Sequence, residues 1–269
     1  MRQLVEVALG VHVATAGTWA TTSTLVVSAQ GDCLVVDPAL TPADLAGLAS
    51  AIATRGWRVV AGFATHAHWD HVLWSAQLGD APRWATPGAC RVARAGREAI
   101  CREADADAPG HDHALTALLT PLPDGAGPGL PRTVPWAGPA ALVVEYRAHC
   151  PGSGALVVPE LGLMCAGDVL SDREVPLLDL DAADPVADHL AALDALEAVI
   201  AEHGLRTVVP GHGTVTDAAG ARRRAERDRA YLSAVIGDDP VEDARLADPW
   251  VAGQHTEQLT RLRSRRSGR

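Results

Sequence analysis

The chain begins with short apolar runs whose spacing predicts β-strands. Three such runs, over residues 4–9, 24–28 and 33–37, are rich in Val and Leu. Gly31-Asp32, between the second and third runs, indicates a hairpin. An unbroken apolar run over 59–64 predicts a strand that is covered on both faces.

Four segments have the apolar spacing of amphipathic helices. The first begins after Thr41, whose hydroxyl suits an N-cap and is followed by a proline, and it ends before Gly56. The other three are predicted over 87–102, 185–203 and 217–235. We also expect a helix to start after Asp70, which follows the strand over 59–64.

The second half of the chain repeats the strand-rich pattern. Strands are predicted over 142–146, 155–158, 163–166 and 207–209, and a short strand over 83–86 completes the first half. Each half places strands before helices, and this order favours one four-layer domain over two separate domains. We place this single domain at residues 1–237 and treat 238–269 as a C-terminal extension.

Residues 105–141 interrupt the pattern because they are rich in Pro, Gly and Asp. We interpret them as a surface excursion with a short helix near 114–119, since loops of this length are uncommon unless they are functional or disordered. His111-Asp112-His113 within the excursion could bind a metal, but a solvated or lid-forming loop is the favoured interpretation. The extension is expected to be partly flexible, because its basic end over 261–269 is typical of a fraying terminus.

Composition and charge narrow the possible functions. The 269 residues are 48% hydrophobic and carry a formal net charge of −10, which disfavours binding to nucleic acid or to anionic membranes and leaves a small-molecule substrate. The five cysteines are widely spaced, and the chain has neither a secretion-signal pattern nor a run of apolar residues long enough to span a membrane. These features predict a cytoplasmic protein with free thiols. A homo-oligomer stays possible.

Metal-binding side chains follow four of the predicted strands. They occur in the sequences THAHWDH, AHCPGSG, CAGDVLSD and VVPGHGT, as His66, His68, Asp70, His71, His149, Asp168 and His212. In an extended segment, residues two apart point the same way, so His66 and His68 can bind one cation. The chain then turns, so that Asp70 and His71 can face a second cation. Imidazole and carboxylate ligands suit Zn²⁺, with Fe or Mn also possible.

The order of these motifs over residues 4–216 resembles the metallo-β-lactamase-fold hydrolase superfamily. The resemblance implies an α+β fold, a four-layer αββα sandwich of two mixed β-sheets flanked by helices. It also implies a dinuclear metal centre in which Asp168 bridges the two ions. A bridging aspartate is similar to the glyoxalase II, lactonase and phosphodiesterase branches, and it differs from the secreted β-lactamases. In the implied ligand sets, His66, His68 and His149 hold the first ion, and Asp70, His71 and His212 hold the second.

Two ions about 3.5–4 Å apart lower the pKa of a shared water toward about 7, which makes hydroxide available. We therefore expect a metal-dependent hydrolase acting on a small ester-like bond: a lactone, thioester or phosphoester. The resemblance assigns Asp70 the catalytic role of orienting this hydroxide.

Three further residues, Trp69, Ser153 and Glu174, are expected near the substrate. Ser153 stands where many members of the superfamily have a histidine. The alternative function is a mononuclear iron oxidoreductase, similar to the persulfide dioxygenases, that uses only the first three-histidine site.

Overall fold

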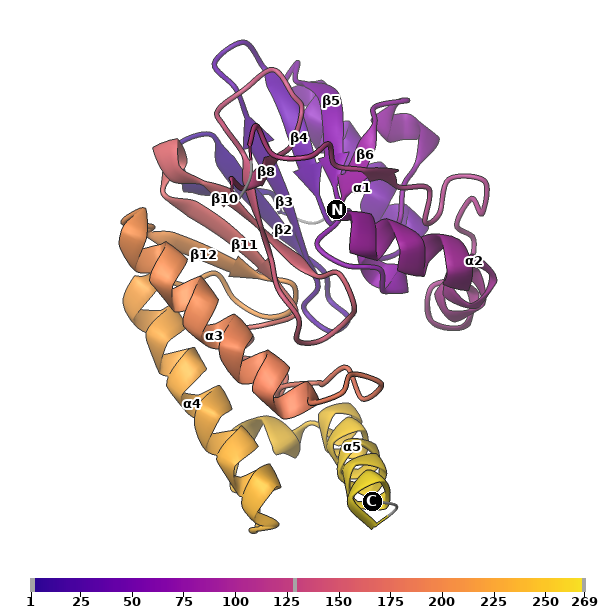
Figure 1. Cartoon of the computed structure of the whole chain (residues 1–269). Coiled ribbons are helices and arrows are strands. Elements are labelled where there is room, and N and C mark those ends of the chain that lie inside the picture. Colours follow the sequence, from indigo (N-terminus) through magenta and orange to yellow (C-terminus); the bar gives the residue numbers. More distant parts are fainter. Residues whose placement is uncertain (1–2, 128–129, 268–269) are drawn as a thin grey trace.

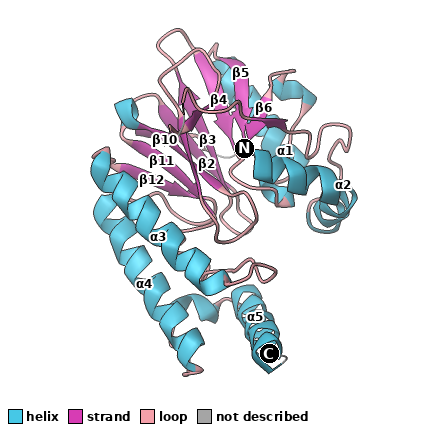
Figure 2. Cartoon of the chain, viewed as in Figure 1, coloured by secondary structure: helices cyan, strands magenta, loops and turns pink. Residues whose placement is uncertain are grey.

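The computed structural model describes residues 3–127 and 130–267 as two mixed β-sheets packed face to face, with helices on both outer faces (Figure 1; Figure 2). Helices α1 (Pro42–Thr54) and α2 (Pro87–Asp107) lie on one side, and α3 (Pro185–Glu202) and α4 (Ala218–Gly237) lie on the other. The predicted αββα sandwich is therefore confirmed.

The first sheet has seven strands in sequence order. Pairing is antiparallel from β1 to β4 and parallel from β4 to β7. The hairpin expected at Gly31-Asp32 joins β3 and β4. The strands are β1 (Val5–Ala8), β2 (Val11–Thr15), β3 (Thr22–Val27), β4 (Asp32–Val36), β5 (Arg58–Phe63), β6 (Arg83–Ala85) and β7 (Thr120–Pro121).

The second sheet has five strands in the order β12-β11-β10-β9-β8. β12 is parallel to β11, and the other neighbours are antiparallel. The strands are β8 (Arg132–Thr133), β9 (Leu142–Glu145), β10 (Gly154–Val158), β11 (Leu163–Gly167) and β12 (Thr207–Pro210).

Three apolar layers hold the sandwich together. Between the sheets, Phe63 of the first packs in one buried cluster with Leu156 and Leu163 of the second. Separate clusters lie under α1 and α2 and under α3 and α4. Burying a side chain such as Phe63 stabilises the fold by about 1.5–3 kcal/mol. Both outer and inner faces of the sheets are therefore covered, which leaves the strand ends to form a site.

Two of the predicted helices are wrong. Where a helix was expected after Asp70, the chain makes only two short 3₁₀ helices, η1 (Trp69–His71) and η2 (Ala76–Leu78), and a 2.8 Å hydrogen bond from Trp74 Nε1 to the Gly79 carbonyl closes the loop that contains η2. Residues 114–119 form turns, because the positive φ of Ala117 (57°) ends the helical path. In addition, α2 continues to Asp107, so the excursion starts later than expected.

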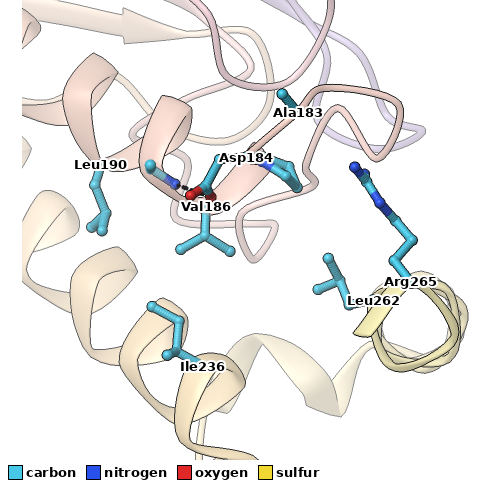
Figure 3. Close-up of a pocket in the computed structure, with 9 residues that line it drawn as sticks. Ala183, Asp184, Val186, Leu190, Ile236, Leu262 and Arg265 are labelled. Atoms are coloured by element: carbon cyan, nitrogen blue, oxygen red, sulfur yellow. Dashed lines mark hydrogen bonds between the residues drawn. The ribbon is translucent and has the colours of Figure 1, made fainter. Parts of the chain in front are cut away.

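The sequence pattern does not reveal helix α5 (Pro249–Ser267), which begins after the 3₁₀ helix η4 (Ala244–Ala247). Val251 and Leu262 of α5 are buried in one cluster with residues of α4, and the helix includes the described part of the basic end; the expected fraying of 261–269 stays a prediction. Side chains of α3, α4 and α5 line one largely apolar cavity of about 360 Å³. Leu190, Ile236 and Leu262 are among them (Figure 3).

None of the helices in the described part of the chain combines the length and the apolar character that a membrane crossing requires. The five cysteines are all buried and unbridged, as expected of free thiols.

Candidate metal centre

The segments that carry the histidines and aspartates leave their strands at one edge of the sandwich. Residues 66–71 follow β5, and His149, Asp168 and His212 follow β9, β11 and β12. β9 and β11 are both antiparallel to β10, and β12 is parallel to β11. The C-terminal ends of these three strands therefore point the same way.

Hydrogen bonds between the two sheets close this edge. The Gly154 amide donates to the Thr65 carbonyl, and the Thr22 amide donates to the Gly211 carbonyl, both at 2.8 Å. Because each bond joins a residue of one sheet to a residue next to a histidine or aspartate of the other, the four segments meet in one place.

Three imidazoles and one carboxylate form the first group. His68 Nδ1 lies 3.1 Å from His66 Nε2 and 2.8 Å from His149 Nε2. Asp168 Oδ2 lies 3.4 Å from His66 Nε2 and 3.2 Å from His149 Nε2. Ligands bound at about 2.0–2.1 Å to one tetrahedral zinc ion are roughly 3.3 Å apart, and the observed spacings are close to this value.

A second group lies next to the first. His71 Nε2 and His212 Nε2 are 3.3 Å apart, and Asp70 Oδ2 lies 3.4 Å and 3.3 Å from them, respectively. Asp168 also faces this group, with Oδ1 3.2 Å from His71 Nε2 and Oδ2 3.4 Å from His212 Nε2. Asp168 is thus placed between the two groups.

The close packing around Asp168 suits a bound cation. Its Oδ1 is buried and has no hydrogen-bond partner among the described residues, which is costly for a carboxylate oxygen unless a cation is near. A Cβ at Gly211 would lie 1.9 Å from this oxygen and 2.9 Å from His71 Cε1, so only glycine leaves the cradle open. The residues present therefore fit two divalent ions that share Asp168.

The outer nitrogens of three histidines are held by protein oxygens. His149 Nδ1 lies 2.9 Å from the Leu177 carbonyl, and His66 Nδ1 lies 3.1 Å from Thr65 Oγ1. His212 Nδ1 lies 3.2 Å from both Thr21 Oγ1 and the Trp19 carbonyl. Such bonds fix the ring orientation and the tautomer of a metal ligand.

Asp37 lies beside the ring of His71, without hydrogen-bond geometry to it among the described residues, and is a residue that the sequence analysis missed. Its Oδ2 lies 3.1 Å from His71 Nδ1 and accepts a 2.7 Å hydrogen bond from Thr65 Oγ1, while Oδ1 accepts from the Thr65 amide at 2.8 Å. An aspartate at the end of the apolar run over 33–37 was the available signal. Its function becomes visible only because β4 lies beside β5.

The charges of the two groups depend on one another. Burial alone would lower the pKa of His71, but the surrounding carboxylates raise it well above its usual value. Burial would likewise raise the pKa of Asp168, but the neighbouring imidazoles lower it well below its usual range. For His68, burial and the adjacent imidazoles lower the pKa. Cations entering the site would therefore compete with protons held by His71 and its neighbours.

A cavity of about 850 Å³ opens above both groups. Trp69 and Glu174 line it, as expected for residues near a substrate, and Glu174 Oε1 lies 3.7 Å from His212 Nδ1. Burial raises the pKa of Glu174 to about 7. Ser153 does not line this cavity: it is 1% exposed, and its hydroxyl donates a 2.8 Å hydrogen bond to the Cys150 carbonyl. The expected substrate contact of Ser153 is therefore not supported.

Trp19 also lines the cavity and was not predicted. Its φ of 53° is in the left-handed region, which costs a bulky residue roughly 1–3 kcal/mol. This conformation presents its carbonyl to His212. No sequence pattern marks the position.

The residues of the excursion lie elsewhere. His111 Nε2 lies 2.9 Å from the Leu40 carbonyl, and His113 pairs with Asp105 at 3.1 Å. Among the described residues they belong to no cluster with metal-binding geometry, which agrees with the loop interpretation.

Comparison with known proteins identifies the family of this chain. A family model described as the metallo-beta-lactamase superfamily matches residues 16–212. No curated protein is similar enough in sequence to be matched with this chain.

Solved structures share the fold. A metallo-beta-lactamase family protein from Thermus thermophilus, TTHA1429, is 23% identical with a TM-score of 0.64, over 87% of this chain and 82% of its own. A beta-lactamase domain protein from Burkholderia ambifaria is 20% identical with a TM-score of 0.67, over 97% and 88%. TTHA1623, solved in a di-iron-bound form, is 28% identical with a TM-score of 0.60, over 79% and 97%.

Proposed function

Since the chain belongs to the metallo-β-lactamase superfamily, we propose that it is a hydrolase that binds two divalent ions and cleaves a small lactone, thioester or phosphoester. Zinc is the metal that we propose first. Members of the superfamily are generally metal-dependent hydrolases. The observation that carries the proposal is the pair of ligand groups that share Asp168 at the floor of one cavity.

When bound, two such ions supply a water of lowered pKa and polarise the bond to be broken. The side chains of the protein position the reactants. Asp70 is only 6% exposed, but it lines the cavity. Its carboxylate contacts His71 and His212. We propose that Asp70 orients the attacking water.

The walls beside the floor keep bulk water away from the reaction. Trp69 is 6% exposed and follows His68 directly, and Leu177 and Leu178 also line the cavity. A partly dry site strengthens the electrostatic interactions on which the hydrolysis depends.

A second candidate function uses iron. The first group, His66, His68 and His149 with Asp168, is a complete ligand set by itself, and the protein TTHA1623 binds two irons in its structure. An iron oxidoreductase with one ion in this group, similar to the persulfide dioxygenases, would need only these residues. Fe or Mn in both groups would also be compatible with hydrolysis.

Metal analysis of the purified chain, combined with a panel of lactones, thioesters, phosphodiesters and β-lactams, separates the candidates. We expect about two zinc ions per chain and turnover of one ester-like class. One iron with oxygen uptake would favour the second candidate. His68→Ala should lose turnover, and His113→Ala, a histidine outside the cavity, serves as its control. Full turnover in His68→Ala would overturn the proposed mechanism.

A small-molecule substrate suits a cavity of this size, and we propose that neither nucleic acid nor a membrane is a partner. A cytoplasmic location and a possible homo-oligomer also remain predictions. Gel filtration combined with light scattering would measure the oligomeric state.

A further inference from the structure

The rim of the 850 Å³ cavity carries mainly acidic side chains. Helix α2, the loop over 177–181 and helix α5 each contribute to it. Among the described residues that line the cavity above the metal centre, the charged rim side chains are Glu103, Asp107, Asp179, Asp181, Glu257 and Arg261.

The one cationic side chain of this rim is already paired. Arg261 Nη2 lies 3.0 Å from Asp181 Oδ1, so this pair adds little net charge. In the part of the chain that the structure describes, no ion pair joins the other four carboxylates to an arginine or histidine. Four carboxylates without such a cationic partner therefore line the rim.

Three tryptophans connect the floor to the rim. The rings of Trp69 and Trp19 are 5.7 Å apart at an interplanar angle of 70°, and those of Trp19 and Trp250 are 5.6 Å apart at 30°. Trp69 is almost buried beside Asp70, whereas Trp250 on α5 is 39% exposed. All three line the same cavity, so they form a continuous aromatic wall.

Each feature alone has an ordinary explanation. Exposed carboxylates are common on protein surfaces, and indole rings pack against any apolar group. A cavity that has both features favours positively charged ligands. The faces of indole rings attract cations, most of all alkylammonium groups, and the carboxylates add a longer-range attraction.

We propose that the substrate carries a cationic alkylammonium group, held between the aromatic wall and the rim carboxylates, and that substrates with a distal carboxylate or phosphate are selected against. This inference rests on the proposed hydrolase function. The ester-like bond then lies over the ligand groups, where divalent ions make the floor positive, and the cation points to the negative rim. The opposite signs of floor and rim therefore orient the substrate.

Three thioesters with the same acetyl group test the proposal on the zinc-loaded full chain. They are the cation acetylthiocholine, its uncharged isostere S-(3,3-dimethylbutyl) thioacetate, and the anion S-acetyl-3-mercaptopropionate. We expect kcat/KM to fall in that order, with at least about a tenfold difference between cation and anion. The difference should shrink at high salt, because salt screens the exposed carboxylates.

Variants locate the effect. Glu257→Gln combined with Asp107→Asn should reduce the ratio of cation to uncharged turnover several-fold, and Trp250→Leu should reduce it while keeping an apolar side chain. Glu226→Gln, at an exposed position of α4 outside the cavity, should leave the ratio unchanged.

A binding measurement makes the test independent of turnover. Choline and 3,3-dimethylbutanol differ in charge but hardly in shape, and titration calorimetry on the zinc-loaded protein should show tighter binding of choline. Equal or weaker binding of choline, or an anion turned over as well as the cation, would overturn the inference and leave the hydrolase intact. If no ester, lactone or phosphodiester is turned over while choline binds preferentially, the hydrolase proposal fails and the cation site stands.

Discussion

The floor and the rim of the cavity are built in different ways. The floor consists of buried or half-buried histidines and aspartates at strand ends, and several of them are hydrogen-bonded to Thr65 beside β5 or, for His149, to the Leu177 carbonyl of the next loop. The rim consists of exposed side chains on two helices and a loop, with few contacts between them. The difference indicates that the reaction depends on the rigid sheets and that substrate selection depends on elements outside them.

The two regions are joined through the C-terminal segment. Arg245 Nη1 donates to the Glu174 carbonyl at 2.7 Å and pairs with Asp228 Oδ1 at 2.6 Å. Gln258 of α5 accepts from the Leu178 amide and donates to the Pro176 carbonyl. The loop over 174–178 therefore transmits the position of α5 to the floor.

The largest expected effect comes from breaking the floor itself. Asp168→Ala removes the carboxylate that both ligand groups share, so we expect kcat/KM to fall by roughly a thousandfold or more, with metal content below two ions per chain. Metal analysis and kinetics on the ester-like substrate measure both. Asp239→Ala, an exposed aspartate at the end of α4, is the control. A variant that keeps two tightly bound ions would contradict the bridging position.

The next effect concerns the link between the regions. Arg245→Met leaves the buried Asp228 without its partner, and breaking a buried pair of this kind costs about 3–5 kcal/mol of the free energy of unfolding. Urea unfolding measures this change. The double variant Arg245→Met with Asp228→Leu should recover part of the loss, because Asp228 is then no longer a buried unpaired charge and only Asp243, which also pairs with Arg245 at 2.7 Å, has lost its cation. Equal losses in the single and double variants would show that packing, not charge, dominates.

A smaller effect is expected where the sheet supports the floor. Asp37→Asn keeps the shape of the side chain but removes the negative charge beside His71, and loss of such a supporting contact lowers metal affinity by roughly 10–100-fold. Competition with a chelator measures the affinity. Asp32→Asn, at the other end of β4 and paired with Arg58, should leave it unchanged. Equal affinities in all three proteins would mean that His71 needs no support.

His189 is a buried histidine outside the floor. It allows the cost of burying a histidine without hydrogen bonds to be measured. Neither of its ring nitrogens has a hydrogen-bond partner among the described residues, and burial lowers its pKa to about 3. The unfolded chain binds the proton near the ordinary pKa of 6.5 and the folded chain does not, so acidification from 6.5 toward 3 favours unfolding.

His189→Phe should remove this contribution. We expect its stability to exceed that of the parent protein increasingly as the pH falls from 6.5 to about 3, with a gain of about 1 kcal/mol at neutral pH from the lost unpaired polar group. Urea unfolding of both proteins across this pH range gives the difference. A difference that does not change with pH would mean that His189 is protonated in the folded protein.

The smallest effect belongs to the rim. Trp250→Ala removes part of the aromatic wall far from the ligands, so KM should rise a few-fold while kcat, metal content and the unfolding midpoint stay nearly the same. A large loss of kcat would show that the rim and the floor are not separable.

Strand periodicity and local motifs predict much of the sandwich. The apolar runs before His66, His149, Asp168 and His212 are strands as expected, and their ends carry the expected residues. Strands β2, β7 and β8 and helix α5 were missed; β7 and β8 lie in the segment that was interpreted as an excursion. α5 has only a few buried apolar residues, such as Val251 and Leu262, among many polar ones, so its sequence pattern is weak.

What the sequence by itself determined is the set of side chains able to bind metal, because their spacing at strand ends is a local property of the chain. Only the tertiary structure decided that Asp37 supports His71, that Ser153 faces away from the cavity, and that α2 and α5 form an acidic, aromatic rim. The contacts of Asp37 and of the rim join residues from distant parts of the chain, and they depend on how strands and helices pack together, which local periodicity does not specify.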